Sequence, residues 1–136
     1  MSEAHVFPLR VYFEDTDAGG IVYYANYLKF AERARTEMLR DIGLESSTMM
    51  ADEGIALAVR TCTADYRKPA VLDDGLEIHS RLLEIGGASL SMEQRVMRDG
   101  DELVNVQIRL ACMGGIGKSA RLPDGVRAKL EQLCAT

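Results

Sequence analysis

The residues best placed for chemistry form a short acidic run just before a glycine turn. The run Glu-Asp-Thr-Asp at positions 14–17 is followed by Ala-Gly-Gly at 18–20, and a helical pattern begins soon afterwards. A carboxylate and a flexible turn that lead into a helix N-terminus make a compact place for carbonyl chemistry, because the amide donors at a helix start stabilise negative charge. Asp17 is therefore predicted to carry the chemistry.

Asp17 also fits a purely structural role. Asp residues before helices commonly cap the helix or stabilise a turn, although Asp17 lies several residues before Tyr23, which is far for a simple cap. Glu14 and Asp15 are interpreted as supporting or solvated residues. Strand alternation would place Asp15 on the side of Asp17, where two like charges would raise a carboxyl pKa.

One long helix is predicted from about Tyr23 to Ile42. At about 1.5 Å per residue it spans roughly 30 Å, and Gly43 is expected to end it as a C-terminal cap residue. No Gly or Pro interrupts it, and apolar residues recur at steps of three and four residues, namely Tyr27, Phe30, Ala31, Ala34, Met38 and Ile42.

Five strands are predicted around this helix. They are joined by a short helical connector at 45–53 and by tight turns at 86–87 and 99–100, and a terminal helix is expected from about Pro123. In the last strand the alternating apolar residues 104–112 should face inward. The predicted strands cover residues 6–15, 55–68, 75–85, 88–98 and 102–113.

This element order indicates an α+β fold in which a curved antiparallel sheet wraps around one nearly buried helix. The length of 136 residues fits a single domain spanning residues 1–136. The net charge of −5 argues against nucleic-acid binding. The chain has neither a basic N-terminal head followed by an apolar run nor eighteen consecutive apolar residues, so a soluble cytoplasmic protein is expected. Three widely spaced cysteines argue against disulfides and structural zinc, and no metal site is predicted.

Two segments of the chain resemble a known family. Residues 10–44, RVYFEDTDAGGIVYYANYLKFAERARTEMLRDIGL, and residues 66–78, YRKPAVLDDGLEI, are similar to the 4-hydroxybenzoyl-CoA thioesterase-like hotdog family, in the same order. The likeness is close to the branch encoded with the Tol-Pal envelope machinery. It implies a hotdog fold, with a five-stranded antiparallel sheet around a central helix. It also implies acyl-CoA thioesterase activity without a metal or redox cofactor.

The resemblance also implies roles for single residues. The family's catalytic carboxylate, a nucleophile or general base, matches Asp17, and the backbone N–H that holds the thioester oxygen at the helix start matches Tyr24. Gly19 and Gly20 would let the backbone pass close to the substrate without a side chain in the way. The Tol-Pal branch often has His where this chain has Tyr24. The backbone role survives that change, whereas any proton transfer by the His does not.

Other residues are predicted to bind substrate. Asn26 could face the site or bond a neighbouring loop, which is the default expectation. Arg67 and Lys68, which would otherwise be ordinary solvated charges, are candidates for the CoA phosphates. Ser89 is an ordinary strand residue on most readings, with a smaller chance of facing the acyl pocket, and the same holds for Ser91. The full substrate-binding set is Gly19, Gly20, Val22, Asn26, Tyr66, Arg67, Lys68 and Ser89, with Lys118 and Arg121 as further phosphate candidates.

The expected partner is an acyl-CoA substrate, with acyl carrier protein as an alternative donor, and a homo-oligomer. A hotdog sheet leaves an open edge that a second copy can cover, so a dimer is the minimum and the family suggests a tetramer. Two other functions stay open. A hotdog dehydratase would need a His near the helix start, where the chain has neither His5 nor His79. A non-catalytic acyl-thioester binding protein linked to envelope lipid metabolism is the other.

Overall fold

A computed structural model describes residues 4–134 of the chain. Its main helix, α1 (Asn26–Asp41), presents one buried face that includes Tyr27, Phe30, Ala34 and Met38. The predicted apolar stripe therefore faces the core, and Gly43 has the left-handed φ of +82° expected of a residue that ends a helix. The helix begins three residues later than predicted. The backbone turns at 23–25 instead, where Asn26 N–H donates to Tyr23 O at 2.8 Å.

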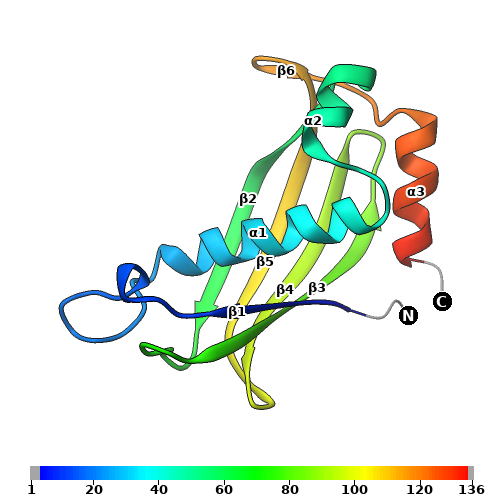
Figure 1. Cartoon of the computed structure of the whole chain (residues 1–136). Helices are drawn as coiled ribbons and strands as arrows, with labels where there is room; N and C mark the ends of the chain where they lie inside the picture. The colour runs from blue at the N-terminus through cyan, green and yellow to red at the C-terminus, as the bar shows by residue number, and fades with distance from the viewer. Residues whose placement is uncertain (1–3, 135–136) are drawn as a thin grey trace.

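The sheet is antiparallel and curled, and α1 runs across it (Figure 1). The spatial order is β1-β3-β4-β5-β2, and a short β6 pairs with β5. The meander of three consecutive strands is as predicted, and β2 lies beyond β5 at the far edge. The strands are β1 (His5–Arg10), β2 (Ala56–Tyr66), β3 (Gly75–Ile85), β4 (Ser89–Arg98), β5 (Asp101–Gly115) and β6 (Lys118–Ser119).

The predicted first strand is too long at its C-terminal end. Its last strand pair is Arg10 with Gly75, the first residue of β3. Val11 still bonds to the backbone of Asp73 and Asp74 before β3, and the chain then leaves the sheet. Phe13–Asp15 instead forms a short 3-10 turn, labelled η1, in which the Asp15 carboxylate accepts a hydrogen bond from Tyr12 N–H at 2.8 Å. The strand alternation that would have placed Asp15 beside Asp17 is therefore wrong.

Bulges between the main strands help the sheet to curl, because an extra residue in one strand bends it and increases its twist. The register between β2 and β5 shifts between Val59 and Thr61, which leaves Arg60 unpaired on the edge strand. The pairing of β3 with β4 shifts after Leu82, and that of β4 with β5 shifts after Val96.

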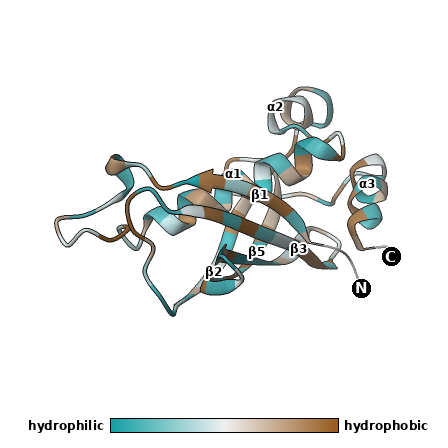
Figure 2. Cartoon of the chain, turned by 60° about the horizontal axis from the view of Figure 1, so that its bottom comes forward, coloured by the Kyte–Doolittle hydropathy of each residue, from teal (hydrophilic) through white to brown (hydrophobic). Residues whose placement is uncertain are grey.

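The core lies between α1 and the concave side of the sheet. Alternate residues of the central strands are buried, and Figure 2 shows hydrophobic and hydrophilic segments alternating along β3. Residues 104, 106, 108, 110 and 112 of β5 are buried as predicted, whereas Arg109 faces solvent.

The shorter helices lie near one another, next to the C-terminal end of α1 (Figure 1). The predicted connector forms as α2 (Ser46–Thr48) followed by η2 (Met49–Glu53), and the terminal helix forms as α3 (Asp124–Cys134), which packs against β3. The sequence analysis missed β6, which lies in the glycine-rich break before α3. Among residues 4–134, no helix is both long and apolar enough to cross a bilayer.

The β4–β5 hairpin gives a first prediction. Gly100 has a φ of +85°, and a Cβ added there would meet no atom within 4 Å, so backbone conformation is the only cost of a side chain. Gly100→Ala should therefore lower the free energy of unfolding by about 1 kcal/mol. Gly115→Ala is the matched control, because that position is equally open and has no positive φ. Equal losses for the two variants in urea unfolding would contradict the prediction.

Candidate active site

A tight loop between η1 and α1 carries Asp17. Asp17 N–H donates to Ile21 O at 2.9 Å, and Gly20 N–H donates to Asp17 O at 3.0 Å. Position 20 requires a glycine, because its φ of +84° is one that other residues rarely adopt. Two isolated bridges, Thr16 with Val22 and Ile21 with Val71, tie the ends of the loop to each other and to the segment after β2. The loop at 17–21 is thus held by backbone bonds at both ends, which limits where its carboxylate can lie.

The Asp17 carboxylate bonds only within its own loop. Its Oδ1 accepts a hydrogen bond from Gly19 N–H at 2.8 Å, and within residues 4–134 its Oδ2 has no hydrogen-bond partner. Asp17 therefore does stabilise a turn, but it does not cap α1, whose N-cap residue is Ala25. A Cβ on Gly19 would lie 3.2 Å from Oδ1. The glycine thus leaves room for a carboxylate that keeps one oxygen available.

Asp17 lines a surface hollow of about 480 Å³. Its apolar walls include Phe13, which is 80% exposed, and Leu72, which is 43% exposed. Gly20, Thr16 and Ala18 complete the lining. Phe13 and Leu72 thus place exposed apolar surface beside the carboxylate, which suits contact with a ligand or another chain.

Free amide donors lie between this loop and α1. Within the described residues, the backbone N–H groups of Tyr24 and Ala25 make no hydrogen bond, and Ala25 provides no side-chain cap. Tyr24 stands two residues before Asn26 rather than within the first helical turn, which corrects the expected helix start. Its amide still lies next to the positive end of α1, where negative charge is stabilised.

Tyr24 lines a second cavity of about 270 Å³ next to the Asp17 loop. Tyr66 stacks edge-on against Tyr24 with ring centroids 6.1 Å apart, and Tyr27 lies 5.8 Å from Tyr66. Burial raises the pKa of both Tyr27 and Tyr66, so these hydroxyls stay neutral at physiological pH. The lining is Ile21, Val22, Tyr24, Tyr27, Tyr66, Arg67, Lys68 and Pro69.

The structure brings some of the predicted site residues together and leaves others apart. Val22, Tyr24, Tyr66, Arg67 and Lys68 share the tyrosine-lined cavity, while Asp17 and Gly20 line the neighbouring hollow. The sequence analysis missed Tyr27 as a cavity residue, because its helical spacing indicated only the core. It missed Phe13 and Leu72 because no local pattern marks the lining of a hollow.

Asn26 and Ser89 are not brought to either hollow. The Asn26 side chain donates to Asp15 O at 2.9 Å and so fastens the start of α1 to η1, which is the structural alternative. Ser89 pairs with Ala111 of β5, whereas Tyr66 pairs with Val104. Seven residues of strand, roughly 24 Å, separate these positions. Ser89 accepts a hydrogen bond from Arg109 at 3.1 Å.

The remaining serine and phosphate candidates lie at the Ser89 end of the sheet. Ser91 pairs with Arg109. Lys118 of β6 pairs with Gly115 of β5, and Arg121 approaches Gly87 in the β3–β4 turn.

Carboxylates already hold the two cations at the tyrosine-lined cavity. Arg67 Nε donates to Asp65 at 2.9 Å, Arg67 also pairs with Glu102, and Lys68 lies 3.4 Å from Asp101. Either cation would have to release its carboxylate to bind a phosphate. Within residues 4–134, no three His, Cys, Asp or Glu side chains gather in a way that could hold a metal ion.

Glu102 is the centre of this charge network and gives a second prediction. Partial burial raises the pKa of Glu102. Hydrogen bonds from Arg95 and Asn105 and the charges of Arg67 and Arg95 lower it by more, so the pKa lies below the usual 4.5. A depressed carboxyl pKa stabilises the fold above the unfolded value and is lost as pH falls through the folded one. Glu102→Gln should therefore lower stability at pH 7 by on the order of 1 kcal/mol.

The loss caused by Glu102→Gln should shrink as pH falls below 4.5. Urea unfolding at pH 7 and at pH 3.5 measures it. Glu84→Gln is the control, because Glu84 is exposed and makes no ion pair within the described residues. A loss that is the same at both pH values would contradict the assigned role of Glu102.

Comparison with known proteins places the chain among thioesterases. Residues 11–130 match the model of the thioesterase-like superfamily. The acyl-CoA thioesterase YbgC of Haemophilus influenzae is 42% identical over 128 residues, covering 93% of this chain and 94% of that protein. The acyl-CoA thioester hydrolase YbgC of Escherichia coli O157:H7 is also 42% identical over 128 residues, covering 93% and 95%. A probable thioesterase from Bartonella henselae superimposes with a TM-score of 0.85 at 37% identity, covering 88% of this chain and 99% of that one.

Proposed function

Because this chain belongs to the thioesterase-like superfamily, we propose that it hydrolyses acyl-CoA thioesters to a free acid and CoA. The family resemblance of residues 10–44 and 66–78 is thereby confirmed, and the named relatives with 42% identity support the same activity. One structural observation carries the proposal. Residues 17–25 carry both the Asp17 carboxylate, which has one unbonded oxygen, and the unbonded backbone N–H groups of Tyr24 and Ala25, among the described residues.

In this proposal Asp17 acts as general base or as nucleophile. As a base, its carboxylate takes a proton from water while the water oxygen bonds to the thioester carbon. The carbonyl oxygen then becomes negative, and the N–H of Tyr24, next to the helix N-terminus, stabilises that charge. The carbon–sulfur bond breaks, and the CoA thiolate leaves and takes up the proton. As a nucleophile, Asp17 would instead form an acyl anhydride that water then opens.

The tyrosine-lined cavity is proposed to hold the end of the substrate next to the thioester. Val22, Tyr66, Arg67 and Lys68 would contact the acyl group or the pantetheine arm. Gly19 and Gly20 would keep side chains out of its path. The CoA phosphates would compete with Asp65, Glu102 and Asp101 for the two cations. Acyl carrier protein is the alternative donor, because it presents the same pantetheine thioester.

We further propose that the chain is one hotdog domain, that it works in the cytoplasm and that it acts as a homodimer or a dimer of dimers. Strand β2 supports the proposed assembly, because among residues 4–134 it pairs with β5 alone and leaves its other edge open. Sedimentation velocity should then give a species of at least twice the 15.0 kDa chain mass. A monomer at assay concentration would contradict the proposed assembly.

The histidines favour hydrolysis over a dehydratase. His5 Nε2 lies 2.8 Å from Asp41 at the far end of α1, and His79 Nε2 lies 3.0 Å from Glu77 on β3. Neither His lines the two hollows beside residues 17–25. A dehydratase would need a His and an acid facing one cavity.

An acyl-CoA panel tests the proposal directly. Release of the CoA thiol should be followed for short, medium, long and aromatic acyl groups, together with loss of water from a 3-hydroxyacyl thioester. We expect thiol release from at least one class and no water loss. Absence of thiol release across the panel, with binding retained, would favour a non-catalytic acyl-thioester binding protein linked to envelope lipid metabolism.

A further inference from the structure

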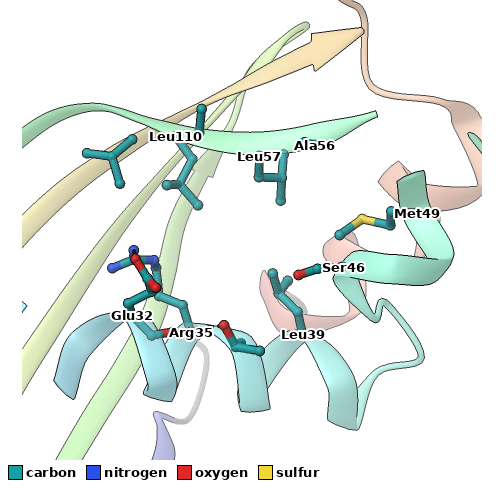
Figure 3. A pocket seen from close by; sticks show the side chains of 11 residues that line it. Glu32, Arg35, Leu39, Ser46, Met49, Ala56, Leu57 and Leu110 are labelled. Atoms are coloured by element: carbon teal, nitrogen blue, oxygen red, sulfur yellow. Dashed lines mark hydrogen bonds and ion pairs between the residues drawn. The ribbon is translucent and has the colours of Figure 1, made fainter. Parts of the chain in front are cut away.

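The segment at residues 69–74, between β2 and β3, forms a wall shared by both hollows beside residues 17–25. Pro69 lines the tyrosine-lined cavity, and Leu72 lines the Asp17 hollow. Another cavity, of about 400 Å³ between α1 and β2, is lined instead by residues of α1, α2, η2, β2 and β5 (Figure 3). The position of residues 69–74 therefore bears on the candidate active site.

Ala70 joins this segment to the candidate active site. Its C=O accepts a hydrogen bond from Val22 N–H at 2.9 Å, and Val22 lies between Asp17 and Tyr24 in the chain. Its N–H donates to the Tyr27 hydroxyl at 2.9 Å, so Ala70 is also fixed to α1. Ala70 is 0% exposed and Tyr27 is 3% exposed, and a buried hydrogen bond of this kind is costly to break. The backbone between Asp17 and Tyr24 must therefore follow the position of Ala70.

Asp74 and Arg98 hold the segment from its other side. Asp74 Oδ2 accepts hydrogen bonds from Val71 N–H at 2.9 Å and from Arg98 Nη1 at 2.8 Å. The same Nη1 donates to Pro69 O at 3.1 Å. Partial burial raises the pKa of Asp74, but hydrogen bonds from Val71 and Arg98 and the charge of Arg98 lower it by more. The Asp74 carboxylate is therefore charged at neutral pH, and it holds both the cation and the backbone.

The turn at residues 71–74 contains a backbone conformation that needs this support. Asp73 has a φ of +71°, which residues other than glycine adopt only occasionally. Asp74 N–H donates to Val71 O at 3.1 Å, and Arg10 Nη1 donates to Asp73 O at 2.7 Å. These bonds fix the turn, and the turn holds Leu72 against the hollow that it lines.

We propose that Asp74 is a positioning residue for thioester hydrolysis. Together with Arg98 it holds residues 69–71, and through Ala70 these residues set where the Asp17 carboxylate lies relative to the Tyr24 N–H. Accurate placement matters, because a displacement of about 1 Å can lower a rate about 10²-fold. The inference rests on the proposed function, since it concerns the same site. Asp74 acts from outside both hollows and touches no reacting atom.

Asp74→Asn tests the positioning role, because it removes the charge that holds Arg98 and keeps the shape of the side chain. We expect the kcat for acyl-CoA hydrolysis to fall about tenfold and KM to change less than about threefold, since alignment in the transition state is lost rather than binding. Asp73→Asn is the matched control. Asp73 is the exposed neighbour, its side chain makes no hydrogen bond among the described residues, and Asn tolerates a positive φ. Its kcat should stay within about twofold of the native value.

Amide hydrogen exchange separates positioning from a loss of stability. The Val22 N–H should exchange at least about tenfold faster in Asp74→Asn than in the native protein, because its bond to Ala70 O is loosened. Amides in the middle of β4 and β5 should keep their native rates. A merely structural role would instead speed the exchange of all these amides together.

A second variant covers the case in which Asp74→Asn does not fold. Tyr27→Phe removes one hydroxyl and leaves the Ala70 N–H without its acceptor, so it should also speed Val22 exchange. The inference is overturned if Asp74→Asn keeps the native kcat, or if Asp73→Asn loses as much activity. It is also overturned if Val22 exchange increases no more than that of the β4 and β5 amides. A native protein without thioesterase activity would reject the proposed function alone, because Val22 exchange needs no turnover and still decides whether Asp74 holds the segment.

Discussion

Asp17→Asn should lower the kcat for acyl-CoA hydrolysis by about 10³-fold and leave the fold intact. A positioned general base typically contributes this much, and a carboxamide can neither accept the proton nor attack the thioester. The Asn Oδ1 can still accept the hydrogen bond that Gly19 N–H donates to Asp17 at 2.8 Å, so the loop should keep its shape. Thiol release at saturating acyl-CoA measures the effect.

Glu14→Gln is the matched control for Asp17→Asn. Glu14 is a neighbouring exposed acid with no side-chain hydrogen bond among the described residues, so its loss changes the local charge by the same amount. We expect its kcat to stay within about twofold of the native value, since surface charges change little. If the two variants lost the same activity, the effect would come from local charge rather than from Asp17, and the catalytic assignment would be withdrawn.

Replacing the Tyr24 amide by an ester should lower kcat by about 10²-fold to 10³-fold. An ester oxygen cannot donate a hydrogen bond, and loss of one donor to a developing oxyanion typically costs this much. The change can be made by introducing the hydroxy-acid analogue of tyrosine at position 24. The Tyr24 N–H bonds to no other group within residues 4–134, so the fold should lose little stability. Single-turnover hydrolysis of one acyl-CoA measures the rate.

Tyr24→Phe separates the backbone of residue 24 from its side chain. Phe keeps the amide and the ring that stacks on Tyr66, and loses only the hydroxyl. If the backbone carries the role, kcat should change less than about threefold. A larger loss in Tyr24→Phe than in the ester variant would assign the proton transfer or the oxyanion contact to the hydroxyl.

Periodic patterns predicted most of the fold. The buried stripe of α1 and the alternation along β5 both depend on a long run of residues that face one core, so each position supports the next. The turn at Asp99–Gly100 could be predicted for a similar reason, since both residues have positive φ, at 49° and 85°. The glycine that ends α1 belongs to the same class of strong local signal.

The end of β1 could not be predicted in this way. Residues 6–15 continue to alternate, but a strand extends only as far as its neighbour does, and β3 begins at Gly75. Side-chain capping by Asp15 then competes successfully with strand pairing. Where one strand stops is a property of two segments that lie 65 residues apart in the register of Arg10 with Gly75.

The candidate site shows the same division. The sequence alone could predict that Asp17, the two glycines and Tyr24 lie close together, because they fall within one short stretch. It could not predict that Ser89 pairs seven positions along β5 from the partner of Tyr66, since that depends on strand register.

The unpaired Arg60 affects how molecules of this protein can join. A flat, uninterrupted edge strand can recruit further strands without limit, which is how fibrils grow. On β2 the ladder breaks between Val59 and Thr61, and a long charged side chain stands at the break. On each side of the break, β2 presents only a few consecutive backbone N–H and C=O groups to another strand. The bulge should therefore favour a closed pair of molecules and work against open-ended polymerisation.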